Sequence, residues 1–365
     1  MTNTSMVSTY SRLGAIYAEQ LSSRGAAAAM LTHKWQARDL IAPHSDIDIR
    51  VILDHAPTSW WKWNEQLAAA HDQAVRLDPL HSRLLEHPPG FAFTVSELDR
   101  GRVSPAGVCT WSLVTGSATP LQRWQTRAQE MPWSSTDERF YRGILDARVK
   151  GRYQLDNDST DNVLHDLDAY RKHCIAWHYV APCWLAAAAL TTRTRFPGKT
   201  AALSQWQPGE LAEHATKFLH LATTSQPSLA PSEQLAAAHA ALQALLLRTP
   251  PAQALLDEPS AYTQAWTTTA GMLRVRVARW IYYLNPPPRT ATDYLIAREE
   301  KELDSARKTL TRIADITTGD DVLLAKAMAG LLPSGPTTPS ALRDLLALWH
   351  RHRSVVEDFL SAHSA

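Results

Sequence analysis

The sequence predicts an α+β protein in which a small mixed sheet is followed by an all-helical bundle. Short runs rich in β-branched and aromatic residues, typical of strands, occur only in roughly the first 150 residues. After about residue 155, apolar residues recur at helical spacing, and proline-rich breaks separate the helical segments. Strands confined to one part of a chain and helices to the rest indicate the α+β class.

The first part alternates between helix and strand. Apolar residues at helical spacing predict helices over 8–28 and 59–77. The prolines of HPPG (87–90) end the second helical segment. The expected strands are DIDIRVIL (46–53), FAFTVSEL (91–98) and VCTWSLV (108–114).

The second part carries only helical patterns. Proline-rich breaks at 248–253, 285–290 and 332–340 divide it into segments of bundle length. We therefore expect an α/β domain over 1–155 and a helical domain over 156–365.

Composition and charge narrow the class of protein. The formal net charge of +1 argues against a large polyanion-binding surface, so nucleic acid is an unlikely partner. The 3 cysteines form no disulfide framework, which favours a reducing compartment. No secretion signal opens the chain and no apolar run is long enough to cross a bilayer, so we expect a cytoplasmic location.

Two aspartates stand at the start of the first predicted strand. Residues i and i+2 of a strand point to the same side, so Asp46 and Asp48 would project together. Two carboxylates held this close repel one another unless a cation lies between them, and Mg²⁺ suits such ligands. The alternative is that Asp46 caps a turn while Asp48 is a solvated edge residue.

The stretch PHSDIDIRVI resembles the signature of the DNA-polymerase-β-like nucleotidyltransferases, in particular the branch with the aminoglycoside nucleotidyltransferases. That family has a helix, a strand ending in Gly-Ser, a short loop, and then Ser-Asp-x-Asp on the next strand. A helical domain after the α/β domain is also similar to this branch. The resemblance covers roughly the first third of the chain by motif.

The resemblance implies a catalytic arrangement. Asp46 and Asp48 match the aspartates that hold Mg²⁺, which binds the triphosphate of the nucleotide. A hydroxyl group of the acceptor then attacks the α-phosphorus and pyrophosphate leaves. ATP is the expected co-substrate, and Ser45 would lie beside the metal-binding carboxylates.

The chain departs from the family pattern at the Gly-Ser element, where it reads THKW (32–35). Glycine lets the backbone approach the phosphates, and His33 and Lys34 do not reproduce that geometry. Lys34 would either supply a positive charge to the phosphates or occupy their site.

A third carboxylate is expected from the strand 91–98. Glu97 is the only acid within that run, and it would be a metal ligand or general base. The family's acid often lies earlier on the strand, where this chain has Ala92 or Phe93. A solvated strand-end role for Glu97 remains open.

The turn at Gly198-Lys199 offers a further cation. In aminoglycoside-type adenylyltransferases a similar turn brings a lysine to the triphosphate, which makes Lys199 the matching residue. The alternative is an ordinary helix end with its preferred glycine and basic residues.

The sequence therefore predicts a Mg²⁺-dependent nucleotidyltransferase that moves a nucleoside monophosphate from ATP to a hydroxyl of a small molecule, such as an antibiotic or natural-product intermediate. Asp46, Asp48 and Glu97 are the expected catalytic residues, and Lys34, Ser45 and Lys199 the expected nucleotide contacts. The alternative is a degenerate nucleotidyltransferase fold that binds or regulates, or that was recruited to other chemistry.

Overall fold

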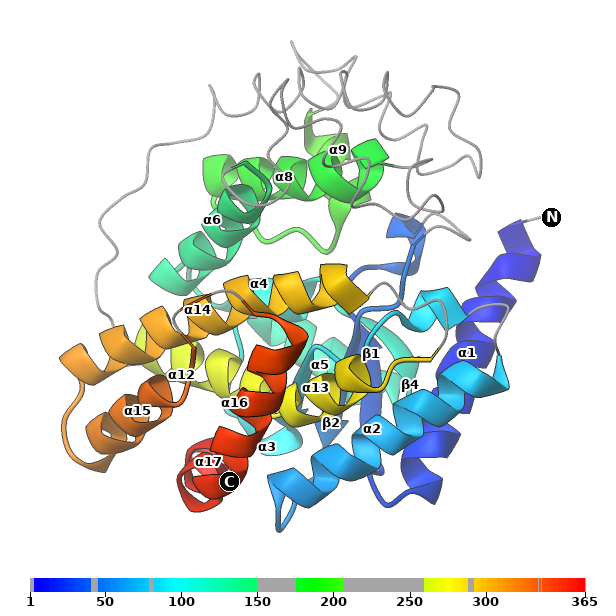
Figure 1. The fold of residues 1–365 in the computed structure, drawn as a ribbon. Helices are drawn as coiled ribbons and strands as arrows, with labels where there is room; N and C mark the ends of the chain where they lie inside the picture. The colour runs from blue at the N-terminus through cyan, green and yellow to red at the C-terminus, as the bar shows by residue number, and fades with distance from the viewer. Residues whose placement is uncertain are drawn as a thin grey trace, which may run out of the picture.

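The computed structural model describes residues 3–40, 45–78, 82–149, 175–206, 259–287, 292–333, 335 and 337–364. Within these ranges the predicted α+β class is confirmed: one small mixed sheet is surrounded by helices (Figure 1). None of the described helices is both long and apolar enough to cross a membrane.

The sheet has four short strands in the order β3-β2-β1-β4. Its strands are β1 (Met30–His33), β2 (Ile49–Leu53), β3 (Phe91–Thr94) and β4 (Ser112–Thr115). β1 is antiparallel to both β2 and β4, whereas β2 and β3 are parallel. In the parallel pair, Arg50 is level with Phe91 and Leu53 is level with Thr94.

Helices cover both faces of the sheet. α1 (Asn3–Ser23) and α2 (Trp60–Leu77) pack on one face through a core that includes Leu13, Tyr17 and Leu67. α4 (Pro105–Cys109) and α5 (Ala118–Glu130) pack on the other face. α2 begins one residue after Ser59, whose side chain accepts a hydrogen bond from the backbone N–H of Lys62.

The remaining described helices follow these. They are α3 (Val95–Asp99), α6 (Ser135–Val149), α8 (Ile175–Thr192), α9 (Lys199–Trp206), α12 (Pro259–Leu273), α13 (Arg276–Leu284), α14 (Thr292–Ile316), α15 (Asp320–Gly330), α16 (Pro339–Arg351) and α17 (Arg353–Ser361). Short 3₁₀ turns, η1 (Ala37–Asp39) and η2 (Ser82–Leu85), complete the set.

All three predicted strands are wrong in their extent. DIDIRVIL (46–53) is a strand only from Ile49, so Asp46 and Asp48 lie just before the first paired residue of β2. FAFTVSEL (91–98) is a strand only as far as Thr94, where the chain turns into α3. VCTWSLV (108–114) begins in α4, and its strand, β4, covers residues 112–115. In the last two places short-range hydrogen bonds start or end a helix where β-branched and aromatic residues favour strand.

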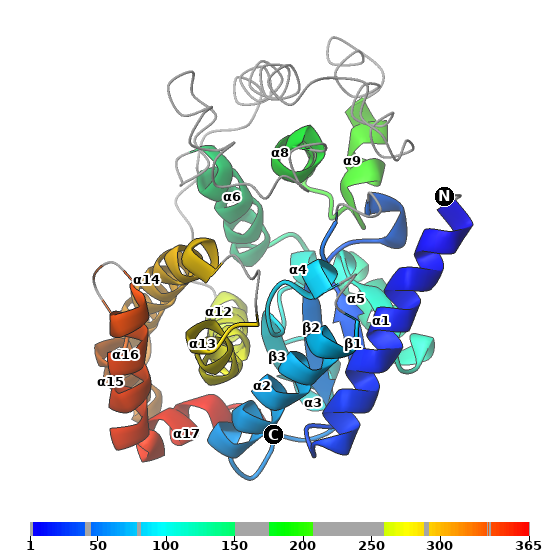
Figure 2. The same ribbon diagram turned by 45° about the vertical axis from the view of Figure 1, so that its right-hand side comes forward.

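The helices after residue 259 share a core with the first part of the chain. Buried residues from Leu13 to Leu360 form one continuous hydrophobic cluster that includes the sheet residues Val51 and Ala92. Figure 2 shows α12 and α13 between the sheet and the outer helices α14 to α16. Gly271 of α12 is needed for this packing, because a Cβ there would lie 2.3 Å from Cε1 of Phe93. The predicted boundary at 155/156 lies outside the described residues.

Candidate metal and nucleotide site

The backbone places two distant segments side by side at the start of β2. The N–H of Ile47 donates to the carbonyl of Leu84 (2.8 Å), and the N–H of Gly90 donates to the carbonyl of Ile49 (2.9 Å). These bonds join residues 47–49 to residues 84–90, which lead into β3. His87 therefore lies beside Asp48, at the end of the sheet where the parallel strands β2 and β3 begin.

Asp46, Asp48 and His87 form the candidate metal cluster. One ligand atom from each side chain lies within 4.8 Å of the others. His87 is almost fully buried, and the Asp48 side chain is 24% exposed. The His87 Nε2 atom lies 3.6 Å from Asp48 Oδ1. Two carboxylates and one imidazole can together hold a divalent cation.

The hydrogen bonding of His87 fixes its tautomer. Nδ1 lies 2.7 Å from the carbonyl oxygen of Pro88, which can only accept, so Nδ1 carries the proton. In the neutral ring, Nε2 then presents a lone pair. Nε2 is buried and has no hydrogen-bond partner among the described residues, since 3.6 Å to Asp48 is too long. Metal-binding histidines commonly donate their second N–H to a carbonyl in this way.

Positive charges surround the cluster. Burial alone would raise the pKa of Asp48, but the His87 ring in its protonated form and the cations of Lys34 and Arg298 outweigh it and hold that pKa well below its usual range. The Asp48 carboxylate is therefore ionised at neutral pH, as a metal ligand must be.

His33 ends β1 at the position where the family resemblance places the Gly-Ser element. Burial lowers the pKa of His33 to about 4, against the opposing pull of the Asp48 carboxylate. Both of its ring nitrogens are buried without a hydrogen-bond partner in the described structure. The imidazole is thus neutral at pH 7 and retains unused hydrogen-bonding capacity next to the aspartates.

Lys34 and Lys199 meet on one aromatic ring. Lys34 Nζ lies 4.8 Å and Lys199 Nζ lies 5.2 Å from the centre of the Trp35 ring. The charge of Lys34 also reaches Asp48 in the cluster, and the charge of Lys199 reaches His33. The structure therefore brings the two predicted lysines to the same edge of the sheet, although they are distant in the sequence.

Lys199 is positioned through the start of α9. The Asp39 carboxylate accepts hydrogen bonds from the backbone N–H groups of Lys199 (3.0 Å) and Thr200 (2.9 Å). Gly198 permits this approach, because a Cβ there would lie 2.0 Å from Asp39 Oδ2. The turn is a helix start capped by Asp39, and not the helix end that the sequence left open.

Ser45 lies just before the aspartates and is almost completely buried. Its carbonyl accepts a hydrogen bond of 2.9 Å from the Tyr10 hydroxyl of α1. Ser45 therefore helps to anchor the start of this segment to α1.

Glu97 is not brought to the cluster. β3 runs parallel to β2, so Glu97 follows the carboxyl end of the pair, whereas Asp48 precedes its amino end. At about 3.3 Å per residue the strands alone separate them by roughly 15 Å. The Glu97 carboxylate instead accepts two hydrogen bonds of 2.8 Å from Arg274 and one of 2.8 Å from the Thr94 N–H.

Aromatic residues occupy the β3 positions on the Asp48 side of the sheet. Arg50 is level with Phe91, so these two side chains share a face. The Arg50 guanidinium lies 5.4 Å from the centre of the Phe91 ring and 5.9 Å from that of Trp111. Ala92 is on the opposite face, in the core with Val51. The β3 strand therefore offers no acid at this site.

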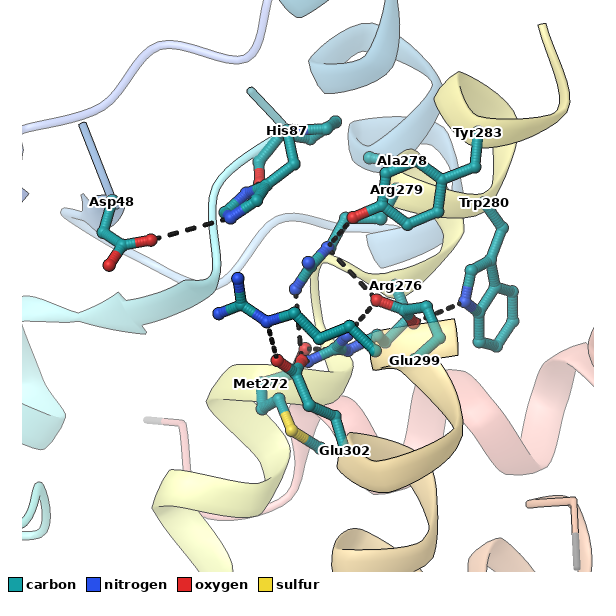
Figure 3. A network of polar contacts seen from close by, with 12 residues as sticks. Asp48, His87, Met272, Arg276, Ala278, Arg279, Trp280, Tyr283, Glu299 and Glu302 are labelled. Atoms are coloured by element: carbon teal, nitrogen blue, oxygen red, sulfur yellow. Dashed lines mark hydrogen bonds and ion pairs between the residues drawn. The ribbon is translucent and has the colours of Figure 1, made fainter. Parts of the chain in front are cut away.

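Figure 3 shows Glu302 in an ion-pair network with Arg276 and Arg279, and Arg298 joins this network through Glu302. Arg298 Nε donates to Glu302 Oε1 (2.9 Å). Glu302 in turn accepts from Arg276 (2.5 Å) and lies 3.3 Å from Arg279. Burial would raise the pKa of Glu302, but these arginines hold it well below its usual range. Arg298 is thus a fixed cation, and its charge reaches Asp48.

Sequence reasoning missed two residues of this site. His87 was treated only as part of a helix-breaking motif, and its position beside Asp48 depends on the pairing of residues 84–90 with 47–49. Arg298 lies in a helix more than two hundred residues from the aspartates, and no local pattern marks it. The one usable signal is a histidine four residues before the strand that pairs with β2.

Comparison with known proteins assigns the chain to no family. It matches no protein-family model, no curated protein and no solved structure at a significant level. The functional argument therefore depends on the site itself.

Proposed function

We propose that this chain is a divalent-cation-dependent nucleotidyltransferase, which transfers a nucleoside monophosphate from ATP to a hydroxyl group of a small molecule. One observation carries the proposal: Asp46, Asp48 and His87 converge within 4.8 Å at the start of β2, with the cations of Lys34 and Arg298 around them. A carboxylate pair ringed by cations suits the phosphates of a nucleotide together with a metal ion.

The residues present fit a divalent cation. Asp46 and Asp48 supply oxygen ligands, and the buried Nε2 atom of His87 lacks any other partner in the described structure. Mg²⁺ is the cation that the sequence resemblance implies. A bound cation would draw negative charge from the phosphoryl oxygens and favour the ionised form of the acceptor hydroxyl.

The lysines and Arg298 would bind the phosphates. Lys34 and Lys199 lie on Trp35 at one side of the aspartates, and Arg298 is held near them by Glu302. Phosphate oxygens gather charge as the bond to the leaving pyrophosphate breaks, and fixed cations stabilise that charge. In the transfer, the acceptor oxygen forms a bond to the α-phosphorus, pyrophosphate leaves, and the hydroxyl proton passes to a base or to solvent.

Pyrophosphate release tests this function. Purified protein with ATP, Mg²⁺ or Mn²⁺ and a panel of hydroxyl-bearing acceptors should release pyrophosphate. Asp46→Asn and Asp48→Asn should each lower the rate by on the order of 100-fold or more, because each removes a metal ligand. Asp54→Asn is the matched control, since Asp54 is exposed just after β2. Equal activity in all three variants would contradict the proposal.

A second candidate is a nucleotide-binding protein that has lost transfer. It is favoured by Ala92 and Phe93, which stand where the family resemblance places an acid, and by His33-Lys34 in place of Gly-Ser. Cation-dependent ATP binding, measured by calorimetry, without pyrophosphate release from any acceptor would favour this candidate over the transferase.

A further inference from the structure

The metal cluster contains a nitrogen donor that nucleotide chemistry does not require. Two carboxylates and phosphate oxygens make an all-oxygen site of the kind that Mg²⁺ prefers. His87 adds a buried imidazole, and its Nδ1–H bond to the Pro88 carbonyl leaves Nε2 as the atom that faces Asp48.

The geometry does not match a hydrogen-bonded ion pair between His87 and Asp48. A charged N–H···O contact is about 2.7–2.9 Å long, whereas Nε2 lies 3.6 Å from Oδ1. Two ligand atoms that each lie about 2.1 Å from one cation are separated by roughly 3.0–3.5 Å at tetrahedral or octahedral angles. The observed spacing is close to that of two ligands on a shared ion.

The backbone holds this imidazole in place without the metal. The Ile47–Leu84 and Ile49–Gly90 bonds fix both ends of the segment that carries His87. Pro88 and Pro89 restrict the backbone between them. A side chain that is buried, rigidly held and unpartnered at Nε2 is suited to ligation rather than to solvation.

We propose that His87 is a nitrogen ligand of this site and that the site selects a first-row transition-metal dication, such as Mn²⁺, over Mg²⁺. Imidazole binds such ions well, whereas Mg²⁺ prefers oxygen ligands and releases its water reluctantly. The inference uses the metal-binding role that the proposed function gives to Asp46 and Asp48, but it does not require transfer of a nucleotide.

Electron paramagnetic resonance with Mn²⁺ tests the proposal on the whole protein. Binding should remove the six-line signal of free Mn²⁺, and Mg²⁺ should restore it only in large excess, at least about tenfold. Pulsed measurements should detect coupling from an imidazole nitrogen, whose frequency changes when histidine is labelled with ¹⁵N. This readout uses the wild type and does not depend on any variant folding.

Two variants assign the nitrogen. His87→Gln should abolish the nitrogen coupling and weaken Mn²⁺ binding by at least about tenfold. His87→Asp should also abolish it while moving the preference toward Mg²⁺, because it replaces nitrogen by oxygen. His55→Gln is the matched control at an exposed histidine and should leave both quantities unchanged.

Several outcomes would overturn the proposal: no nitrogen coupling with Mn²⁺ bound, coupling that persists in His87→Gln, or equal affinity for Mg²⁺ and Mn²⁺. Its failure is distinguishable from that of the proposed function. Pyrophosphate release with Mg²⁺ but no nitrogen coupling would support the proposed transferase function and contradict the role of His87 as a ligand. Nitrogen-coupled Mn²⁺ without pyrophosphate release would support the role of His87 and contradict the transferase function.

Discussion

Two carboxylate centres lie at opposite ends of the parallel pair β2–β3, and they differ in how their charges are satisfied. At the carboxyl end, Glu97 is paired with the fully buried Arg274, which also donates to the carbonyls of Leu360 and Ala92. At the amino end, Asp48 faces the Nε2 atom of His87, which has no hydrogen-bond partner among the residues that the structure describes. A satisfied buried ion pair joins elements together, whereas a buried nitrogen without a hydrogen-bond partner is available to a cation.

The largest expected effect on stability comes from breaking the ion pair between Glu97 and Arg274. Arg274→Met leaves the Glu97 carboxylate buried and uncompensated, which should lower the free energy of unfolding by about 3–5 kcal/mol. Urea unfolding would measure this. The double variant Glu97→Gln/Arg274→Met should recover part of the loss, because no unpaired charge remains. A loss below about 1 kcal/mol in the single variant would contradict the structural role.

Substitutions in the cluster of Asp46, Asp48 and His87 should affect metal binding much more than stability. Asp46→Asn combined with Asp48→Asn should abolish metal binding while lowering the free energy of unfolding by only about 1 kcal/mol. The reason is that asparagine preserves shape, whereas the cations of Lys34 and Arg298, which lower the pKa of Asp48, lose their attraction to its carboxylate. Calorimetric Mn²⁺ titration and urea unfolding on the same samples give both quantities. A large loss of stability would mean that the aspartates are structural, like Glu97.

An effect on stability smaller than that of Arg274→Met is expected at the start of α9. Gly198→Ala would place a Cβ 2.0 Å from Asp39 Oδ2, which should disrupt the cap and cost about 1–2 kcal/mol. Gly143→Ala on α6 is the matched control, because a Cβ there meets nothing within 4 Å. That control should be neutral or slightly stabilising. Thermal unfolding of the two variants measures this difference. Equal melting temperatures would contradict the predicted loss of the cap in Gly198→Ala.

The smallest effect concerns the lysines on Trp35. Lys34→Met should weaken ATP binding about fivefold, the equivalent of about 1 kcal/mol, because one cation near the phosphates is lost. The effect should shrink as salt rises. Lys62→Met, at an exposed position of α2, should leave affinity unchanged. Identical ATP affinities in the two variants would show that Lys34 does not contribute to nucleotide binding.

The sequence predicts the class of the fold and some of its element boundaries. The helix at 59–77 begins within one residue of its expected start, because Ser59 is a strong capping residue. The extent of β3 was also readable: Thr94-Val95-Ser96-Glu97 is a capping-box pattern, and the structure forms both of its hydrogen bonds. The β-branched and aromatic residues of FAFTVSEL favour a strand, which outweighed the capping-box pattern in the prediction.

The parts that could not be predicted depend on contacts between distant segments. The direction of β3 relative to β2 decides that Glu97 lies far from Asp48 and that His87 lies near it. The meeting of Lys34 and Lys199 on Trp35 requires that Asp39 cap a helix 160 residues later in the chain. No local propensity carries this information.

The shared core also determines when the protein can fold during synthesis. Val51 and Ala92 pack in the same cluster as Trp266, Trp349 and Leu360. A ribosome finishes the whole sheet long before it produces these partners, so the emerging sheet keeps part of its apolar face exposed to solvent. Folding must then wait for contacts of very long sequence separation, which slows it. A growing chain of this kind is a natural client for chaperones.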